Sequence, residues 1–131
     1  MSGAIEAVQA FLSGFGVAAR AECDVTERGG GPYLTWLPAE PGLRSATDLG
    51  VRAWHRSAGL QALAALCRAV TGAVGAGLRL PCGDGAVVLW LGDPAWRLEA
   101  VPGDPGLKCA RVALRAMALG GARDQTGGEQ G

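Results

Sequence analysis

The sequence predicts an α+β domain in which one mostly antiparallel sheet carries two helices packed on one face. Two segments place apolar residues three and four positions apart, as amphipathic helices do, and most other segments alternate apolar with polar residues, as half-buried strands do. Glycine and proline are frequent, with 22 and 7 residues among 131, and they separate the alternating segments by turn signals. The order is helix, strands, helix and then a run of strands, which indicates the α+β class.

The first half of the chain is predicted to hold one helix and three strands. The helix covers Ala4–Phe15, with Ser2 as its N-cap. A half-buried strand follows over Val17–Val25 because small apolar residues alternate there with charged ones. Tyr33–Leu37 is rich in aromatic and branched residues and is predicted as a short strand, and Ala46–His55 as the next.

A second helix is predicted to follow directly, with Ser57 as its N-cap. Its apolar stripe, which we expect to face the sheet, consists of Leu60, Leu63, Ala64, Cys67, Val70 and Val74.

The second half is predicted to be a β-meander. Its strands are Leu78–Cys82, Ala86–Leu91 and Trp96–Ala100, and the Gly-Asp sequences at Gly83–Gly85 and Gly92–Pro94 are predicted as turns between them.

The segment Leu107–Leu119 fits either a helix or a strand. We expect a strand, because it follows two hairpins and would close the meander. One face of this strand would then hold Val112, Leu114, Ala116 and Ala118, and the other face the residues Cys109, Arg111, Ala113, Arg115 and Met117.

Two parts of the chain are distinguished by composition. Residues 1–119 are expected to form a single α+β domain. Residues 120–131 have the sequence GGARDQTGGEQG, which contains no large apolar side chain, and we expect them to form a disordered tail.

Charge and hydropathy exclude several classes of protein. The chain has 12 basic and 12 acidic residues and a formal net charge of +0, so specific nucleic-acid binding through phosphate neutralisation is not expected. The most apolar stretch, Ala58–Leu78, has Arg68 near its middle, so no association with a membrane is expected. The N-terminus has no basic region of the kind that signal peptides carry, so we expect synthesis in the cytoplasm.

Catalytic and metal-binding patterns are absent from the sequence. Cys23, Cys67, Cys82 and Cys109 are far apart and His55 is the single histidine, so zinc ligation is not expected and the cysteines are expected to be buried. No nucleophile elbow or phosphate loop is present, and the aspartates of the Gly/Pro turns are explained by turn formation. We therefore expect no enzymatic activity, no catalytic residues and no cofactor.

The four tryptophans raise the alternative of a protein interface, since tryptophan is enriched at binding hot spots. Trp90 and Trp96 are expected to pack within the domain. Four interface candidates lie at the loop after the Tyr33 strand, where prolines would hold the chain extended; they are Trp36, Pro38, Pro41 and Arg44. The fifth is Trp54, which has charged neighbours in the predicted strand Ala46–His55.

Three runs of residues resemble a known family. PYLTWLP at Pro32–Pro38, GVRAWHRS at Gly50–Ser57 and LRLPCGDGAVVLWLGDPAW at Leu78–Trp96 are similar to strands of the tail terminators and related minor tail or neck proteins of long-tailed bacteriophages. The resemblance covers Ile5 to Leu119. The sequence departs from the family in the last strand, where CARVALRAMALGG replaces a β-branched, polar strand.

The resemblance implies a tail-terminator-like fold and a structural role in a virion, in the tail or neck. Such proteins form rings, usually hexamers, on the end of the tail tube, where they stop tube polymerisation and provide the head–tail joining surface. The implied partners are other copies of the chain, the tail tube protein and a head connector or neck protein.

Two other hypotheses remain open at this stage. One is a small-molecule binding module or enzyme accessory subunit with a pocket between helix and sheet. The other is an interaction adaptor unrelated to phage.

Overall fold

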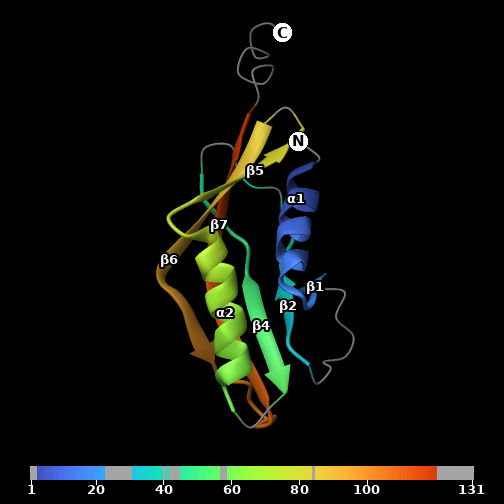
Figure 1. The fold of residues 1–131 in the computed structure, drawn as a ribbon, viewed down its shortest axis with the longest axis vertical. Coiled ribbons are helices and arrows are strands. Elements are labelled where there is room, and N and C mark those ends of the chain that lie inside the picture. The colour runs from blue at the N-terminus through green and yellow to red at the C-terminus, as the bar shows by residue number, and fades with distance from the viewer. Residues whose placement is uncertain are drawn as a thin grey trace, which may run out of the picture.

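A computed structural model of the chain describes residues 3–22, 31–39, 41, 45–56, 59–83 and 85–120. Its seven strands form one sheet in the order β1-β2-β4-β7-β6-β5, with β3 paired to β7 (Figure 1). Only β1 and β2 are parallel among the described pairs; the others are antiparallel. The elements are α1 (Gly3–Leu12), a 3-10 turn (Ser13–Phe15), β1 (Ala18–Ala21), β2 (Tyr33–Trp36), β3 (Thr47–Asp48), β4 (Val51–Arg56), α2 (Gln61–Val74), β5 (Leu78–Cys82), β6 (Gly85–Glu99) and β7 (Leu107–Leu119).

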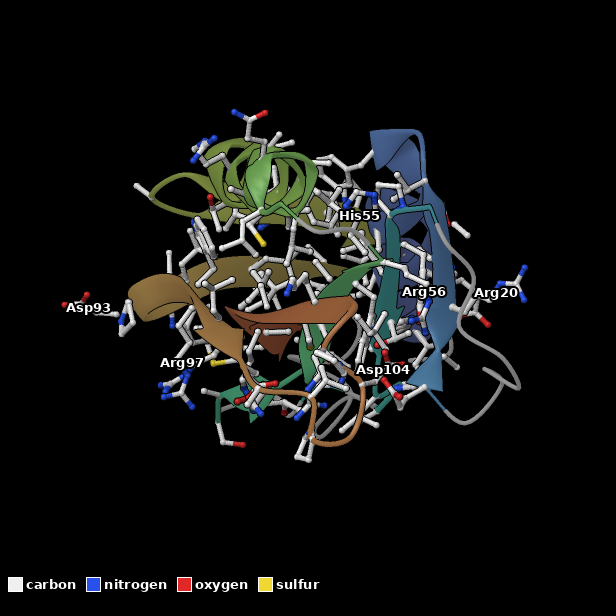
Figure 2. All side chains as sticks on the ribbon, turned by 90° about the horizontal axis from the view of Figure 1, so that it is seen from below. Arg20, His55, Arg56, Asp93, Arg97 and Asp104 are labelled. Carbon is white, nitrogen blue, oxygen red and sulfur yellow. The ribbon has the colours of Figure 1, made fainter. Side chains whose placement is uncertain are left out.

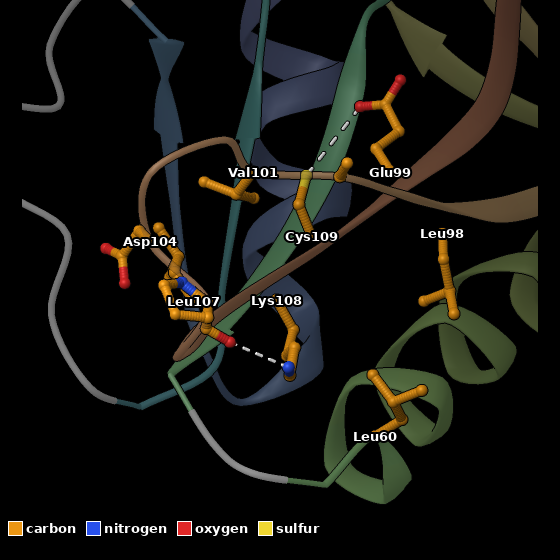
Figure 3. A pocket seen from close by; sticks show the side chains of 10 residues that line it. Leu60, Leu98, Glu99, Val101, Asp104, Leu107, Lys108 and Cys109 are labelled. Atoms are coloured by element: carbon orange, nitrogen blue, oxygen red, sulfur yellow. Dashed lines mark hydrogen bonds between the residues drawn. The ribbon is translucent and has the colours of Figure 1, made fainter.

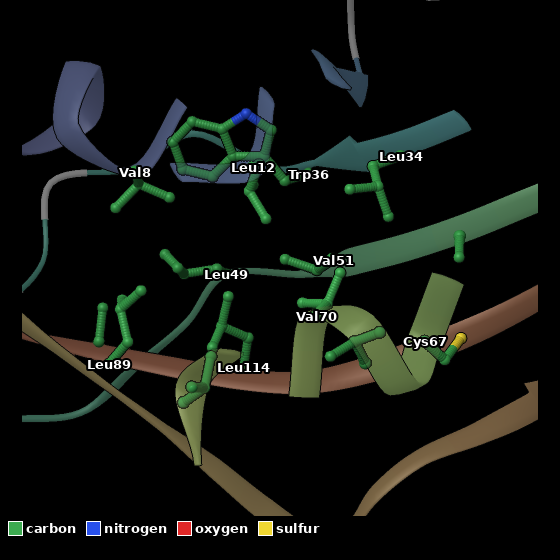
Figure 4. Packing of buried hydrophobic residues seen from close by; sticks show 14 of the residues in the cluster. Val8, Leu12, Leu34, Trp36, Leu49, Val51, Cys67, Val70, Leu89 and Leu114 are labelled. Carbon is green, nitrogen blue, oxygen red and sulfur yellow. The ribbon is translucent and has the colours of Figure 1, made fainter. Parts of the chain in front are cut away.

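Both helices pack against the same face of the sheet and share one core with it. Helix α1 contributes Ala4, Val8 and Leu12, and α2 contributes five residues between Leu63 and Val74. The strands fill the space between the helices with side chains such as Leu34, Val51, Leu89 and Leu114, all 0% exposed (Figure 4). The predicted α+β class, with two helices on a mostly antiparallel sheet, is confirmed.

Helix α2 begins at Gln61, so the prediction that Ser57 caps it is wrong. Leu60 occupies the cap position without a side-chain hydrogen bond and is 41% exposed, so it lies outside the buried stripe. Leu66 is buried in the stripe, beside Leu63 and Cys67. The buried residues of α2 begin at Leu63, and their packing against the sheet stabilises the helix. A serine earlier in the sequence is not sufficient to start the helix before Gln61.

The predicted strand Ala46–His55 is divided in two by Gly50. Gly50 has a φ of +59°, and a Cβ placed there would lie 2.8 Å from Cδ1 of Leu37. Glycine alone adopts this backbone conformation readily and leaves room for the leucine. Its N–H donates to Oδ1 of Asp48 at 2.8 Å, which fixes the step between β3 and β4.

The predicted turn at Gly92–Pro94 is wrong, because β6 is a single strand that runs from Gly85 to Glu99. Both of its halves pair with β7, and the pairing shifts register between Leu91 and Trp96. Glycine, aspartate and proline are typical of turns, but they also occur where a strand bulges.

Leu107–Leu119 is a strand, as predicted, and it lies at the centre of the sheet between β4 and β6. Of its two predicted faces, the one with Val112, Leu114, Ala116 and Ala118 is buried in the core. The predicted disordered tail beyond Gly120 and the end of the predicted strand Val17–Val25 lie outside the described residues.

Candidate functional site

The face of the sheet opposite the helices carries a row of arginines. Strand register places Arg52 of β4 beside Arg111 of β7, and Arg111 beside Arg97 of β6. On the other side of Arg52 the row continues through Thr35 to Arg20. Adjacent strands are about 5 Å apart, so Arg52, Arg111 and Arg97 lie side by side, whereas β2 with the buried Thr35 separates Arg20 from Arg52.

This arginine face, as we call it from here on, concentrates the basic residues of the fold. Each described strand except β2 and β3 contributes at least one arginine at a position that alternates with core residues. Seven of the eight arginines in the described ranges lie on it, and Arg68 on α2 is the other. The seven are Arg20, Arg52, Arg56, Arg79, Arg97, Arg111 and Arg115.

Three of these arginines form ion pairs. Nε of Arg52 donates to Oε1 of Glu99 at 2.9 Å, and Nη2 of Arg111 donates to Oδ2 of Asp48 at 3.0 Å. Arg56 forms a bidentate pair with Asp104, at 3.0 and 2.9 Å, at the lower end of the sheet (Figure 2). Within the described part of the chain, Arg97 and Arg115 form no ion pair.

Asp48 is held ionised by its surroundings. Partial burial favours its neutral form, but the Gly50 N–H, the hydrogen bond and charge of Arg111 and the charge of Arg115 together lower the pKa of Asp48 below its ordinary value. The carboxylate therefore stays charged at neutral pH and orients Arg111.

A polar hollow of about 460 Å³ lies on the arginine face beside the β6 bulge. Its floor is low because Gly92 has no side chain and Ala113 has only a methyl group; a Cβ on Gly92 would lie 3.1 Å from that methyl carbon. The charged and turn residues around this floor are Asp48, Asp93, Pro94, Arg97, Arg111 and Arg115.

A second hollow, of about 400 Å³, lies between the start of α2 and the ends of β6 and β7 (Figure 3). Leu60 and Leu98, which are 41% and 50% exposed, contribute apolar surface to it. Lys108, whose Nζ donates to the Pro105 carbonyl at 2.9 Å, and Glu99 add charged groups. It lies beside the helix, whereas the space between the helices and the sheet is filled by the apolar core.

Trp36 and Trp54 were predicted as interface anchors, but the side chains of both are buried in the domain. Trp36 is 1% exposed and its indole N–H donates to Oε1 of Gln9 at 2.7 Å. Trp54 is 8% exposed, stacks on Tyr33 and donates to Oγ1 of Thr35 at 2.9 Å. Both indoles are covered because Trp36 lies under α1 and Trp54 lies in a small cluster with Val101.

The other predicted interface residues have different environments. Pro38 is exposed, Pro41 is buried and Arg44 lies outside the described residues. Leu37, next to Pro38, is 49% exposed. Trp90 and Trp96, predicted to pack, are partly buried.

The cysteines and His55, the remaining candidates for catalysis or metal binding, form no common site among the described residues. Cys67, Cys82 and Cys109 are buried, as predicted, and Cys23 lies outside the described residues. His55 is half-buried, with no hydrogen-bond partner for Nδ1 in the described part of the chain. Among the residues that the structure describes, no cluster of His, Cys, Asp and Glu could hold a metal ion, and no helix is long and apolar enough to cross a membrane.

These elements define a curled, mostly antiparallel sheet covered by two helices. One solved structure with this fold is a chain from the "Virion of native gene transfer agent (GTA) particle", with a TM-score of 0.66 and 21% sequence identity. The alignment covers 90% of this chain and 96% of that one. No protein-family model and no curated protein matches the sequence.

Proposed function

We propose that this chain is a structural protein of a phage-like virion, located in its tail or neck. The observation that carries the proposal is the fold likeness to a chain of a gene transfer agent virion over nearly the full length of both chains. The near-complete coverage supports a subunit of similar size and architecture in a similar particle.

Within such a particle, we propose a tail terminator, which forms a ring on the end of the tail tube and offers a joining surface to the head. The family resemblance of the Pro32–Pro38, Gly50–Ser57 and Leu78–Trp96 runs supports this role. The sheet ends in β1 on one side and β5 on the other. Two different edges allow head-to-tail contacts between copies, and such contacts form a closed ring when the rotation closes.

The exposed residues directly after β2, Leu37 and Pro38, are the surface we assign to contacts within the ring. Leu37 and Pro38 are exposed there, while the buried Trp36 anchors the start of the loop in the core. A proline that holds the loop extended lowers the entropy lost on docking.

The test is ring formation on tail tubes of the same particle, followed by negative-stain electron microscopy and by mass measurement in solution. We expect rings, of six subunits in the family pattern, that cap tube ends. Pro38→Asp is expected to weaken them without lowering the melting temperature, whereas Pro102→Asp, in another exposed loop, serves as the control. Strict monomers in the presence of tubes contradict the terminator role. If rings form equally well with Pro38→Asp and with Pro102→Asp, the loop after β2 is excluded as the contact between subunits.

A further inference from the structure

We propose that the hollow on the arginine face is a docking site for an acidic polypeptide segment of a partner protein, with Arg97 and Arg115 receiving its carboxylates. The proposal goes beyond the terminator role and does not depend on ring formation. It rests on how charge is distributed over the described face.

The first observation is that the arginines around the hollow differ in their partners. Arg111 is already neutralised by Asp48, at 3.0 Å, and Arg52 by Glu99, at 2.9 Å. Arg97 and Arg115, on neighbouring strands, are exposed and make no ion pair with any described residue. They are the cations at the hollow that have donors available for a ligand.

The second observation is the shape of the hollow. The β6 bulge lies directly beside it, and Gly92 and Ala113 leave its floor without bulky side chains. The Arg115 Nε atom would be 4.0 Å from a Cβ on Gly92, so this guanidinium lies along the floor. Bulges often re-aim side chains next to binding sites. Here Arg97 follows the bulge, opposite Arg111.

The chemistry of the two cations favours carboxylates. A guanidinium presents its donors in a planar fork that matches a carboxylate in bidentate geometry. Two such forks around a hollow of about 460 Å³ suit a short segment with two acidic side chains.

A nucleic-acid backbone fits this surface less well. Asp48 and Asp93 lie at the rim of the same hollow, and Glu99 lies further along the face. These carboxylates would repel a continuous line of phosphates, and the chain as a whole has a formal net charge of +0. A peptide, by contrast, can place its acidic residues at the arginines and neutral residues beside the aspartates.

The experiment measures the fluorescence anisotropy of labelled hexaglutamate on the full chain, at low and at physiological ionic strength. The variants are Arg97→Glu, Arg115→Glu and the double substitution. Arg68→Glu on α2 is the matched control, because it makes the same charge change on the helix side of the fold. A labelled 20-mer DNA duplex is the second probe, and melting temperatures verify that every variant folds.

We expect hexaglutamate binding that weakens about tenfold for each single substitution and is lost in the double variant, while Arg68→Glu leaves it within about twofold. Binding should also fall as salt rises. Absence of hexaglutamate binding, or equal loss in Arg68→Glu, overturns the proposal. Tighter binding of DNA through the same two arginines overturns it in favour of a phosphate ligand. Self-association that the double variant abolishes, without peptide binding, overturns it in favour of a second copy of the chain.

Discussion

Gln9 and Trp36 are joined by a hydrogen bond of 2.7 Å, in which the buried indole N–H donates to the side-chain carbonyl of α1. The amide group of the same glutamine donates to the Ala19 carbonyl at 2.7 Å and to Ser13 Oγ at 3.0 Å. One side chain therefore links helix α1 to strands β1 and β2.

Replacing Gln9 by alanine is expected to destabilise the fold by about 1–3 kcal/mol, because the Trp36 indole would then be buried without an acceptor. Urea unfolding of the purified protein measures this loss. Gln61→Ala, at an exposed position of α2, should change stability by less than about 0.5 kcal/mol. Equal stability of both variants would show that the link contributes nothing.

Leu63→Asp is expected to unfold or aggregate the protein. Leu63 is 0% exposed on α2, and burial of an unpaired carboxylate costs several kcal/mol, which is comparable to the total stability of a small domain. Leu60→Asp, three residues earlier and 41% exposed, should remain soluble and fold cooperatively. Circular dichroism melts of the two variants make the comparison, and similar melts would contradict the docking of α2.

The Asp48 carboxylate is expected to contribute stability that depends on pH. Because its folded pKa lies below the ordinary value of 3.8, the contribution is fully present above that pH and is lost as the pH falls through the lowered folded pKa. Asp48→Asn should therefore lower the melting temperature at pH 7 and make progressively less difference below pH 3.8. Asp93→Asn, whose carboxylate forms no ion pair in the described part of the chain, is the control. A gap between wild type and Asp48→Asn that does not shrink in acid would refute the assignment.

The Cys67 thiol is expected to be unreactive in the folded protein. Burial raises its pKa to about 11, so at pH 8 it is almost entirely protonated and covered by the core. In a variant whose other three cysteines are serine, a thiol-specific disulfide reagent should react slowly, and fast only after denaturant is added. Fast reaction without denaturant would show that α2 opens readily.

Removal of residues 121–131 is expected to leave the melting temperature within a few degrees, because this segment has no large apolar side chain to contribute to a core. Calorimetry of the shortened and full chains tests the prediction. A larger drop would mean that the segment packs against the domain.

Local patterns predicted much of this fold because the elements are built from short repeats in the sequence. The alternation of Leu107–Leu119 was enough to separate its two faces. The helical spacing placed most of the buried residues of α2 correctly, although it included the exposed Leu60 and omitted the buried Leu66. The β6 strand was missed since Gly92–Pro94 has turn chemistry locally, and only pairing with β7 on both sides of it shows that the strand continues.

The candidate site was harder to predict because it, too, depends on how the strands pair. Each strand shows its arginine at a polar position, but the alignment of Arg52, Arg111 and Arg97 depends on the register between β4, β7 and β6. Register is set by contacts between segments far apart in the chain. The tryptophans were misplaced because the sequence alone does not indicate that Gln9 covers Trp36 or that Val101 packs over the Trp54 cluster.

The β6 bulge also fixes how the length of this segment can change. Four residues separate Leu91 from Trp96, while one residue separates their partners on β7, Leu114 and Val112. In a regular strand, side chains five positions apart point to opposite faces of the sheet. The three extra residues break this alternation, so the side chains of Leu91 and Trp96 both lie on the core side. A regular strand of the same length would turn Trp96 outward and the charge of Arg97 into the apolar interior. Loss of one residue would leave Leu91 and Trp96 four positions apart, on the same face of a regular strand, so a homologous chain with one residue fewer here can keep both side chains in the core without a break in the alternation.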